Sequence, residues 1–530
     1  MEFWNVKIWA LALVALVSLS HSAKDGFVSN FTYSAGPGPS TGSLWVVSRG
    51  TSGSGVTLAR LSPGAGTVNV SSMTTELLPD TLTPVQDGVF SDVTAEHRRT
   101  PFASAGNLGF VVPLVAESDS GYLVPWGYFS ARAANAVTAR PHPVPPGDFP
   151  EHSEMAHAVS AFAFDSSTGI LWMARGIYGV LRENVSSGVN SPKRTHFAVN
   201  AKTLLLDSLH ASYKVDSTKN PSVYGIARDA EGTFWLATAG GLFSMDGVTH
   251  KLSRTGVPGL DTARVTGVWT GGEPLQIIAE TSKRYGTNTE DRLWRSYGGK
   301  KFSEVVFRDT SGKAQKNVYD KNDYTTSDVA FIGDKAFLSV QAVEGSKSGL
   351  LKLDSAGAIP FDDEEQWLYG LNAGVVDRNV EVTAVSAFPL TAKILGLAVC
   401  TNGAGISVSA DTGKTWTHIM NQASLGNDLG SIRMIPSVIG AGNQSVVSYK
   451  VSKNSKITIE VFSYDMRKVR TVVKDAERLA SATRSTLATE DFWDGRDAGG
   501  YAVTMGVYYV RVKDNHGHVG WGKVMTLGGR

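Results

Sequence analysis

The stretch 232–247 constrains the fold of this chain more than any other. It reads GTFWLATAGGLFSMDG, in which two apolar, β-rich segments flank the pair Gly240 and Gly241. A glycine pair permits the positive φ angles of a tight hairpin turn, and the closing aspartate and glycine mark a second turn. The stretch therefore predicts two short antiparallel strands, at 234–238 and 242–245.

Similar segments recur along the chain. The opening of the unit, a glycine followed by two residues and a tryptophan, occurs again at 42–45 and 169–172. Short β-rich segments bounded by glycine turns fall into seven groups, at 27–71, 89–139, 158–199, 223–252, 265–307, 327–361 and 382–419. Each group can bury its faces only against its neighbours, and closure into a ring removes free strand edges. The sequence thus predicts an all-β protein with a seven-bladed β-propeller over 24–426. A β-helix would repeat at shorter, more regular intervals.

The first residues have the pattern of an export signal. Lys7 precedes an apolar run at 8–19, and small residues follow at 20–22. The run is shorter than the roughly 20 apolar residues of a membrane-spanning helix. We therefore predict a signal peptide at 1–22, cleaved near Ser22 or Ala23, and no integral membrane span.

Composition narrows the class of protein. The formal charge of +1 argues against a nucleic-acid partner, which would select a basic stripe. Cys400 is the only cysteine, so an intramolecular disulfide and a cysteine zinc cluster are both excluded. A single cysteine in an exported chain fits a bacterial secreted protein. We expect a secreted or outer-surface location, with the periplasm as a further option.

A second domain is expected after the propeller. Glycines, serines and prolines at 427–444 predict a linker, and alternating segments at 446–451, 456–464, 468–473, 506–513 and 519–527 predict strands. They fit a small immunoglobulin-like β-sandwich over 445–530. This part has fourteen Lys and Arg against nine Asp and Glu, an excess of five positive charges. Such an excess of positive charge indicates either an ordinary solvated basic face or a face that is attracted to an anionic surface.

The segment 229–242, DAEGTFWLATAGGL, resembles the propeller repeat of hybrid two-component regulators. That repeat approximates Asp-x-x-Gly-x-Leu-Trp-Val-x-Thr-x-x-Gly-Leu and builds periplasmic sensor propellers. The resemblance implies the propeller architecture alone. The matching residues, to which we assign a structural role, are Gly232, Trp235, Gly240 and Gly241.

A second motif resembles the Asp-box, or BNR repeat. Its pattern Ser-x-Asp-x-Gly-x-x-Trp is matched by Ser409, Asp411, Gly413 and Trp416. We expect Asp411 to accept hydrogen bonds from the turn backbone, Gly413 to take the strained position and Trp416 to wedge between strands. Asp-boxes occur in sialidases and in many non-enzymatic propellers, typically away from the active site, so the expected role is structural.

The segment 492–509 is similar to the immunoglobulin-like domain of the flagellar hook-capping protein FlgD, which recurs at the C-termini of secreted bacterial proteins. The residues that carry this likeness are Trp493, Asp494, Gly495, Asp497, Gly500, Gly506 and Tyr508. Related C-terminal domains are sorting signals for the type IX secretion system. The resemblance implies that machinery as a partner, and export or surface display as the role.

Candidate chemistry is sparse. Three histidines (His142, His152 and His157) lie near Glu151 and Glu154, but their spacing is unlike that of metal ligands. The segment 320–323 lacks the glycine and distal glutamate of a calcium loop, and the acidic run 362–365 is expected to be solvated. We assign no catalytic residue, no metal and no cofactor.

Two functions remain after this survey. The first is a non-catalytic secreted or surface binding or scaffold propeller for a glycan or protein, with aromatic contacts at 126–129 and Tyr285. The alternative is a sialidase-like glycoside hydrolase or a polysaccharide lyase acting in the central funnel. A sialidase would need an arginine cluster and a Tyr–Glu pair, and the sequence has no recognisable arginine triad.

Overall fold

The computed structural model describes most of the chain after its first 30 residues. The described ranges are 31–50, 53–64, 68–77, 82–84, 103–104, 110–117, 123–131, 137–141, 159–185, 194–210, 212–216, 218–282, 291–308, 313–315, 324–342, 349–353, 358–360, 382–401, 405–419, 432–440, 443–450, 454–478, 483–484, 491–515 and 519–527. Over these ranges the protein is almost entirely β-structure. No helix among them has the length and apolar character to cross a bilayer.

Antiparallel sheets follow one another along the first four-fifths of the chain. The first sheet contains β1 (Phe31–Pro37), β2 (Ser43–Gly50), β3 (Gly53–Pro63) and β4 (Val68–Leu77). The second contains β5 (Leu82–Pro84), β6 (Ala103–Ser104), β7 (Phe110–Glu117), β8 (Leu123–Ala131) and β9 (Val137–Pro141). The third contains β10 (Ala161–Asp165), β11 (Ile170–Ala174), β12 (Val180–Asn184), β13 (Arg194–Asn200) and β14 (Leu205–Ser208). The fourth contains β15 (Val223–Arg228), β16 (Phe234–Thr238), β17 (Gly241–Met245) and β18 (Leu252–Arg254).

The short helix α2 (Pro258–Asp261) leads into the fifth sheet, β19 (Arg264–Gly271), β20 (Gln276–Ser282), β21 (Arg292–Tyr297) and β22 (Ser303–Glu304). The sixth contains β25 (Tyr324–Ile332), β26 (Lys335–Ala342) and β27 (Gly349–Leu353). The seventh contains β29 (Val382–Pro389), β30 (Leu395–Thr401), β31 (Ile406–Ser409) and β32 (Thr417–Ile419).

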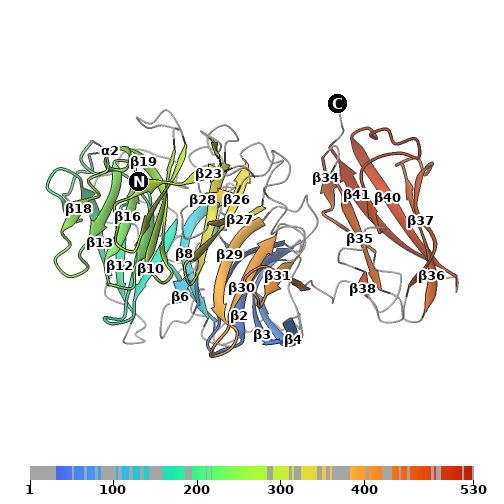
Figure 1. Ribbon diagram of the computed structural model, residues 1–530, viewed down its shortest axis with the longest axis horizontal. Helices are drawn as coiled ribbons and strands as arrows, with labels where there is room; N and C mark the ends of the chain where they lie inside the picture. Colours follow the sequence, from blue (N-terminus) through green and yellow to red (C-terminus); the bar gives the residue numbers. More distant parts are fainter. Residues whose placement is uncertain are drawn as a thin grey trace, which may run out of the picture.

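These sheets form a closed ring. The first or innermost strands lie next to one another in the order β1, β6, β10, β15, β19, β25 and β29, and β29 contacts β1 again. Figure 1 shows the blue first sheet beside the orange seventh. The β-propeller expected from the sequence is confirmed.

Apolar side chains between neighbouring sheets hold the ring together. One cluster packs Trp172 of the third sheet against Phe234 of the fourth, and another packs Leu44 of the first sheet against Phe388 of the seventh. In the repeat unit, Trp235 faces the fifth sheet, as Trp172 faces the fourth. The tryptophan of the repeat therefore covers the next sheet along the chain, and burying such a side chain stabilises the fold by about 1.5–3 kcal/mol.

The hairpin 232–247 occupies the middle of its sheet. Its strands are β16 and β17, and the innermost strand of the sheet is the preceding β15. Of the two central glycines, Gly241 takes the positive φ, 125°, while Gly240 packs against Pro221. A Cβ atom on Gly241 would lie 2.4 Å from the carbonyl oxygen of Asp261, so the close approach of backbone requires glycine there.

The fifth and sixth groups of strands differ from expectation. The segment 302–307 is two strands, and the second of them, β23 (Val306–Arg308), leaves the fifth sheet. It pairs with β24 (Ala314–Gln315) and, in parallel, with β28 (Ala358–Pro360). The reason is burial: Val305 and Phe307 both enter the core shared with the sixth sheet, which draws the chain out of its own sheet.

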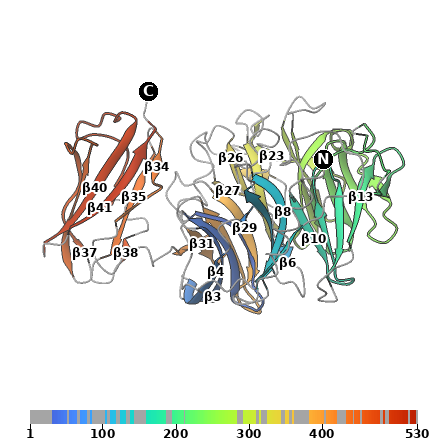
Figure 2. The same ribbon diagram turned by 180° about the vertical axis from the view of Figure 1, so that it is seen from behind.

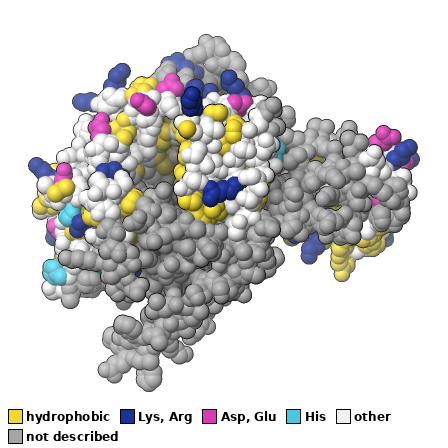
Figure 3. Space-filling model, turned by 90° about the horizontal axis from the view of Figure 1, so that it is seen from below, with side chains coloured by type: hydrophobic (Ala, Val, Ile, Leu, Met, Phe, Trp, Pro, Cys, Tyr) yellow, Lys and Arg dark blue, Asp and Glu magenta, His cyan; other side chains and the backbone are white. Residues whose placement is uncertain are grey.

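The C-terminal residues form a two-layered β-sandwich. One sheet has the order β34 (Val438–Ile439), β41 (Val519–Thr526), β40 (Gly506–Asp514), β36 (Ser455–Phe462) and β37 (Lys468–Arg478). In the other, β35 (Ser445–Lys450) pairs with β33 (Arg433–Ile435), β38 (Thr483–Arg484) and β39 (Phe492–Trp493). Figures 1 and 2 show this sandwich as a separate body beside the ring, and Figure 3 shows hydrophobic and basic side chains projecting from its surface.

The segment 427–444 is more than a linker. It contains β33 and β34, which pair with β35 and β41 and therefore belong to the sandwich. Ile432, Met434 and Ile439 from this segment lie in the sandwich core beside Trp493 and Tyr449. The sequence did not predict these two strands because they are very short, lie among glycines and Pro436, and pair with partners that are distant in sequence.

A buried charge cluster spans the two layers of the sandwich. The Asp491 carboxylate accepts hydrogen bonds from Arg478 Nη2 (2.6 Å) and Nε (3.2 Å), and from the Tyr449 hydroxyl (3.0 Å). The side chains of Arg478 and Asp491 are 6% and 0% exposed. Burial and the neighbouring Asp491 charge raise the pKa of Tyr449 above its usual range.

Candidate functional site

The innermost strands share an irregularity where they begin. In β1, β15, β19, β25 and β29 the pairing with the second strand slips by one residue, which is a β-bulge. The extra residues all bear a hydroxyl group: Tyr33, Tyr224, Thr266, Ser327 and Thr383. We call this end of the ring, with the adjoining turns between second and third strands, the bulge face.

Sequence reasoning missed this repeat, although a local signal exists. The bulge tripeptides are Thr-Tyr-Ser, Val-Tyr-Gly, Val-Thr-Gly, Thr-Ser-Asp and Val-Thr-Ala. Each has a β-branched residue, then a hydroxyl residue, then a residue with a short side chain. Three residues recurring at intervals of about 40–190 are too short a pattern to stand out by eye.

Polar groups of the bulge face link neighbouring sheets. The carboxylate of Glu280 accepts hydrogen bonds from the Thr266 hydroxyl (2.9 Å) and, in the next sheet, from the Thr326 backbone N–H (2.7 Å). The Thr383 hydroxyl donates to the backbone oxygen of Thr32 at 2.7 Å, which joins the seventh sheet to the first. One oxygen of Glu280 and the hydroxyl of Thr383 therefore join neighbouring sheets, whereas the Thr266 hydroxyl bonds within its own sheet.

Aromatic and basic side chains lie at the same end. The turn 175–179 pairs with the fourth sheet through Gly176 and Val223. The guanidinium carbon of Arg264 lies 4.5 Å from the centre of the Tyr224 ring, within the range of a cation–π contact. Tyr178, half-buried on the turn, lies below the guanidinium of Arg175 at 5.4 Å.

Burial and two neighbouring arginines, Arg175 and Arg194, lower the pKa of His196. Burial lowers the pKa of Arg175 to about 10, so the group stays protonated at neutral pH. Burial, together with the positive charges of Arg175 and Arg194, lowers the pKa of His196 to about 4. Arg194 also forms an ion pair of 3.0 Å with the fully buried Glu183. At neutral pH, His196 is therefore uncharged.

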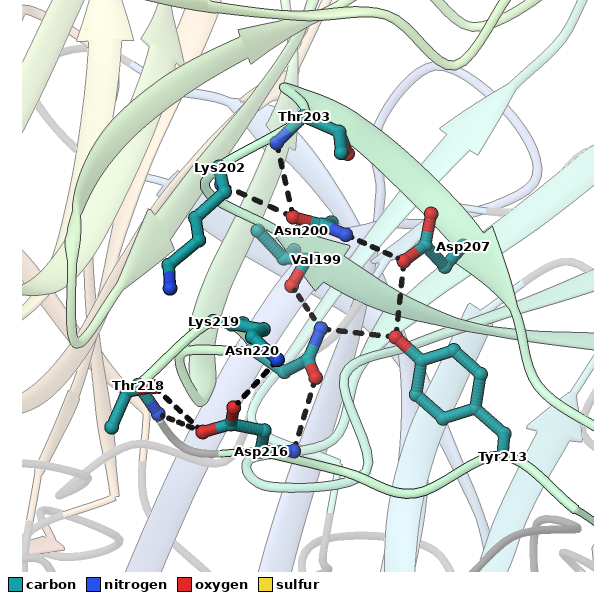
Figure 4. Close-up of polar contacts among 10 residues, drawn as sticks. All are labelled: Val199, Asn200, Lys202, Thr203, Asp207, Tyr213, Asp216, Thr218, Lys219 and Asn220. Carbon is teal, nitrogen blue, oxygen red and sulfur yellow. Dashed lines mark hydrogen bonds and ion pairs between the residues drawn. The ribbon is translucent and has the colours of Figure 1, made fainter.

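The crossing from the third to the fourth sheet is held by a polar network (Figure 4). The Asp207 carboxylate accepts from the Asn200 amide (2.8 Å) and the Tyr213 hydroxyl (3.1 Å). The buried Asn220 amide donates to Tyr213 (3.1 Å) and to the backbone oxygen of Val199 (2.9 Å). This chain of bonds fastens the crossing segment to the edge of the third sheet.

The turn at Asp216, beside this network, is also held by hydrogen bonds and an ion pair. Asp216 accepts from the backbone and side chain of Thr218, and it pairs with Lys219 at 3.1 Å. These hydrogen bonds from Thr218 and Lys219 lower the pKa of Asp216 to about 2. The carboxylate is therefore ionised at neutral pH and unsuited to donate a proton.

In the repeat unit, an aspartate organises the turn before the tryptophan strand. Asp229 Oδ1 accepts the backbone N–H groups of Glu231 and Thr233, at 3.0 and 2.9 Å. Its Oδ2 accepts the indole N–H of Trp235 at 2.9 Å. Gly232 completes the turn with a φ of 94°.

The Asp-box residues form a comparable turn. Asp411 Oδ1 accepts from the Ser409 hydroxyl (2.8 Å) and from the backbone N–H groups of Lys414 and Thr415 (3.0 and 2.9 Å). Gly413 has a φ of 89°, and its backbone oxygen accepts the Trp416 indole N–H at 3.1 Å. Trp416 packs against the apolar cluster between the sixth and seventh sheets.

In the C-terminal motif, a tryptophan and an aspartate likewise hold a turn by hydrogen bonds to its backbone. The indole of buried Trp493 donates to the backbone oxygen of Arg496 at 2.8 Å, and Asp497 accepts the backbone N–H groups of Gly499 and Tyr501. The remaining motif residues lie in or beside this turn: Asp494 accepts from Arg470, Gly495 and Gly500 have positive φ, and Gly506 opens β40. Tyr508 packs on Trp493 with ring centres 5.1 Å apart and donates to the backbone oxygen of Thr504.

Several expected site residues lie outside the residues that the structure describes. These are Tyr285, His142, His152, His157, Glu151, Glu154, the segments 320–323 and 362–365, and the side chains of 126–129. Over the described ranges, no group of three or more His, Cys, Asp or Glu side chains is placed to hold a metal ion.

Comparison with known proteins gives distant structural likeness. The sequence matches no family model and no curated protein. Among solved structures, the extracellular domain of a putative hybrid two-component system from B. thetaiotaomicron has a TM-score of 0.39 at 11% identity, covering 96% of this chain and 59% of that one. A gluconolactonase from Xanthomonas campestris has a TM-score of 0.29 at 11% identity, covering 52% and 85%. The Pan2 WD40 domain of Neurospora crassa has a TM-score of 0.33 at 13% identity, covering 70% and 86%. Because these TM-scores are low, we assign the β-propeller fold from the sheets of this chain itself.

Proposed function

We propose that this chain is a non-catalytic, secreted or cell-surface binding propeller. Its ligand is a glycan or a protein that contacts the bulge face. The C-terminal immunoglobulin-like sandwich, expected over 445–530 and extended by β33 and β34 to about residue 432, serves export, surface attachment or spacing, with type IX machinery as a partner in export.

The observation that carries this proposal is the use of polar groups on the bulge face. Glu280 has a hydrogen bond on each carboxylate oxygen, one within its own sheet and one to the next. Glu280 is also only 4% exposed, whereas a general acid or nucleophile must reach the substrate. At the same end, Tyr178 is half-buried on the turn 175–179, and Arg264, 8% exposed, stacks on Tyr224; aromatic and basic groups of this kind suit a polar ligand.

The test is a glycan array probed with the mature secreted protein, with hydrolysis products measured in parallel. We expect binding without product release, weakened by Tyr178→Ala and by Arg264→Lys, since lysine keeps the charge but loses planar stacking on Tyr224. Val248→Ala, on a turn of the fourth sheet, is the matched control because its side chain is 86% exposed.

The alternative, a glycosidase or a lyase, predicts that the bound glycan is cleaved. Release of sugar products from a bound glycan, abolished by Glu280→Gln in a folded protein, would establish the enzyme. For the sandwich, deletion of 432–530, which includes β33 and β34, should change where the protein is found. Unchanged localisation would overturn its attachment role.

A further inference from the structure

Exposed apolar side chains gather on the C-terminal sandwich. Among the described residues, fourteen large hydrophobic side chains are exposed, and ten of them lie at 438–527, although this part is far shorter than the propeller. Isolated exposed apolar residues are normal on any protein, whereas a cluster marks an interaction surface.

Most of these side chains share one end of the sandwich. Val438 of β34 pairs with Met525 of β41, and Met525 pairs with Val507 of β40. All three are exposed and form a row across three strands of one sheet. Met505 and Leu527, 69% and 57% exposed, lie just beyond the ends of β40 and β41.

Two turns extend this row. The turn between β36 and β37 carries Tyr464 and Met466, and it lies at this end because Phe462 pairs with Tyr509 of β40. The loop that carries Tyr501 is tied to the start of β37 by a backbone bond between Ala498 and Val469. Tyr464 and Tyr501 are 79% and 75% exposed. We call the set of Val438, Tyr464, Met466, Tyr501, Met505, Val507, Met525 and Leu527 the apolar end.

The backbone at Met466 adds a second observation. Met466 has a φ of 61°, in the left-handed region where glycine is unstrained and a methionine is not. Its side chain is 53% exposed, so it gains little from packing within the protein. The turn is closed by backbone bonds from Ser463 to Met466 and Arg467, and it therefore holds a flexible apolar side chain toward solvent.

Charge indicates the kind of partner. Residues 445–530 carry fourteen Lys and Arg against nine Asp and Glu, or +5, and the whole chain is +1, so the remainder is −4. The acidic groups at the apolar end are already engaged: Asp465 pairs with Arg467 at 2.8 Å, Asp494 with Arg470 at 2.8 Å, and Asp497 binds backbone N–H groups. Arg467 shares the pair with Asp465, and Lys468 pairs with Glu460 at 3.5 Å, but both basic side chains are well exposed between the apolar ones, at 86% and 55%.

We propose that the apolar end docks on a phospholipid bilayer that contains anionic headgroups. Tyr464, Met466, Tyr501 and Met505 enter the interfacial layer, and Arg467 and Lys468 meet the lipid phosphates. The apolar groups stand on turns and strand ends with cations between them, which suits a soft layered surface, and tyrosine is favoured at that depth. This inference rests on the attachment role proposed for the sandwich.

The test is co-sedimentation of the full mature chain with vesicles. Vesicles of phosphatidylcholine alone are compared with vesicles containing about one third phosphatidylglycerol. We expect binding to the anionic vesicles, weakened by raised salt, and about tenfold weaker partitioning for Tyr464→Ser or Tyr501→Ser. Val248→Ser, which removes an equally exposed apolar group from the propeller, should bind as the parent does.

Met466→Gly separates docking from folding. Glycine relieves the left-handed backbone, so the variant should keep or raise its melting temperature while binding vesicles less. Equal binding to both vesicle types, or binding to neither, would overturn the proposal. If vesicles do not bind and deletion of 432–530 still changes localisation, attachment stands with a protein as the partner, and the lipid surface is wrong.

Discussion

Replacing Asp491 by alanine should loosen the C-terminal sandwich severely. The carboxylate is the shared acceptor of Arg478 and Tyr449 and is fully buried. Its removal takes the Asp491 charge away from Arg478, whose side chain is only 6% exposed. Breaking a buried ion pair from one side costs about 3–5 kcal/mol, because the surviving charge stays desolvated.

Two further variants separate charge from packing. Asp491→Asn keeps the size of the side chain and loses hydrogen bonds to a charged group, which cost about 1.5–3 kcal/mol. The combination Asp491→Leu, Arg478→Met and Tyr449→Phe removes all three polar groups described in this cluster at once. Replacing a whole buried ionic cluster by apolar groups is often neutral, so this variant should lie within about 2 kcal/mol of the parent.

Hydrogen exchange of the intact chain is the assay, read on peptides that cover β35. A loss of about 3–5 kcal/mol lowers protection there by roughly two to four orders of magnitude, while peptides from β16 and β17 serve as the internal control. A change below about 1 kcal/mol in Asp491→Ala would refute the reasoning. So would a triple variant as unstable as the single one.

Three other perturbations follow from the propeller. Burial lowers the pKa values of His196 and His418 to about 4, so as pH falls below about 6.5 these histidines take up protons in the unfolded chain before they do in the folded one. The free energy of unfolding should therefore drop between pH 6.5 and 4, by at most about 3 kcal/mol per histidine. Glutamine at either position should reduce this pH dependence, as measured by urea titration. Gly241→Ala should cost about 2–4 kcal/mol, since its Cβ would meet the backbone oxygen of Asp261, and an unchanged melting temperature would contradict this. Asp411→Ala should lower the free energy of unfolding by about 1–3 kcal/mol yet leave ligand binding intact; lost binding in a folded variant would show that the Asp-box is functional.

Local patterns predicted the elements that depend on local chemistry. The strands β16 and β17 follow from apolar segments around a glycine pair; β16 has the expected bounds, and β17 begins one residue earlier than expected. The Asp411 turn follows from a motif in which every bond lies within a few residues.

Pairings between distant segments were beyond the reach of the sequence. The parallel pairing of β23 with β28 joins residues about fifty apart, and β33 and β34 are too short to show a period. The fifth strand of the third sheet, β14, is held partly by the fourth sheet, through a bridge from Leu205 to Lys251. The apolar end draws on four separate segments, none of which is unusual alone.

Ring closure has a consequence for the order in which the protein forms. Thr32 bonds to Gly405 and Thr401, so the contact between the first and seventh sheets spans 373 and 369 residues of chain. The apolar face of the first sheet, which includes Leu44 and Val46, stays uncovered until Phe388 and its neighbours arrive. Contacts this distant in sequence form slowly, and the waiting face is prone to misassociate. A chain that emerges N-terminus first therefore completes its ring late, and truncation before the seventh sheet should leave an aggregating product even though six sheets are whole.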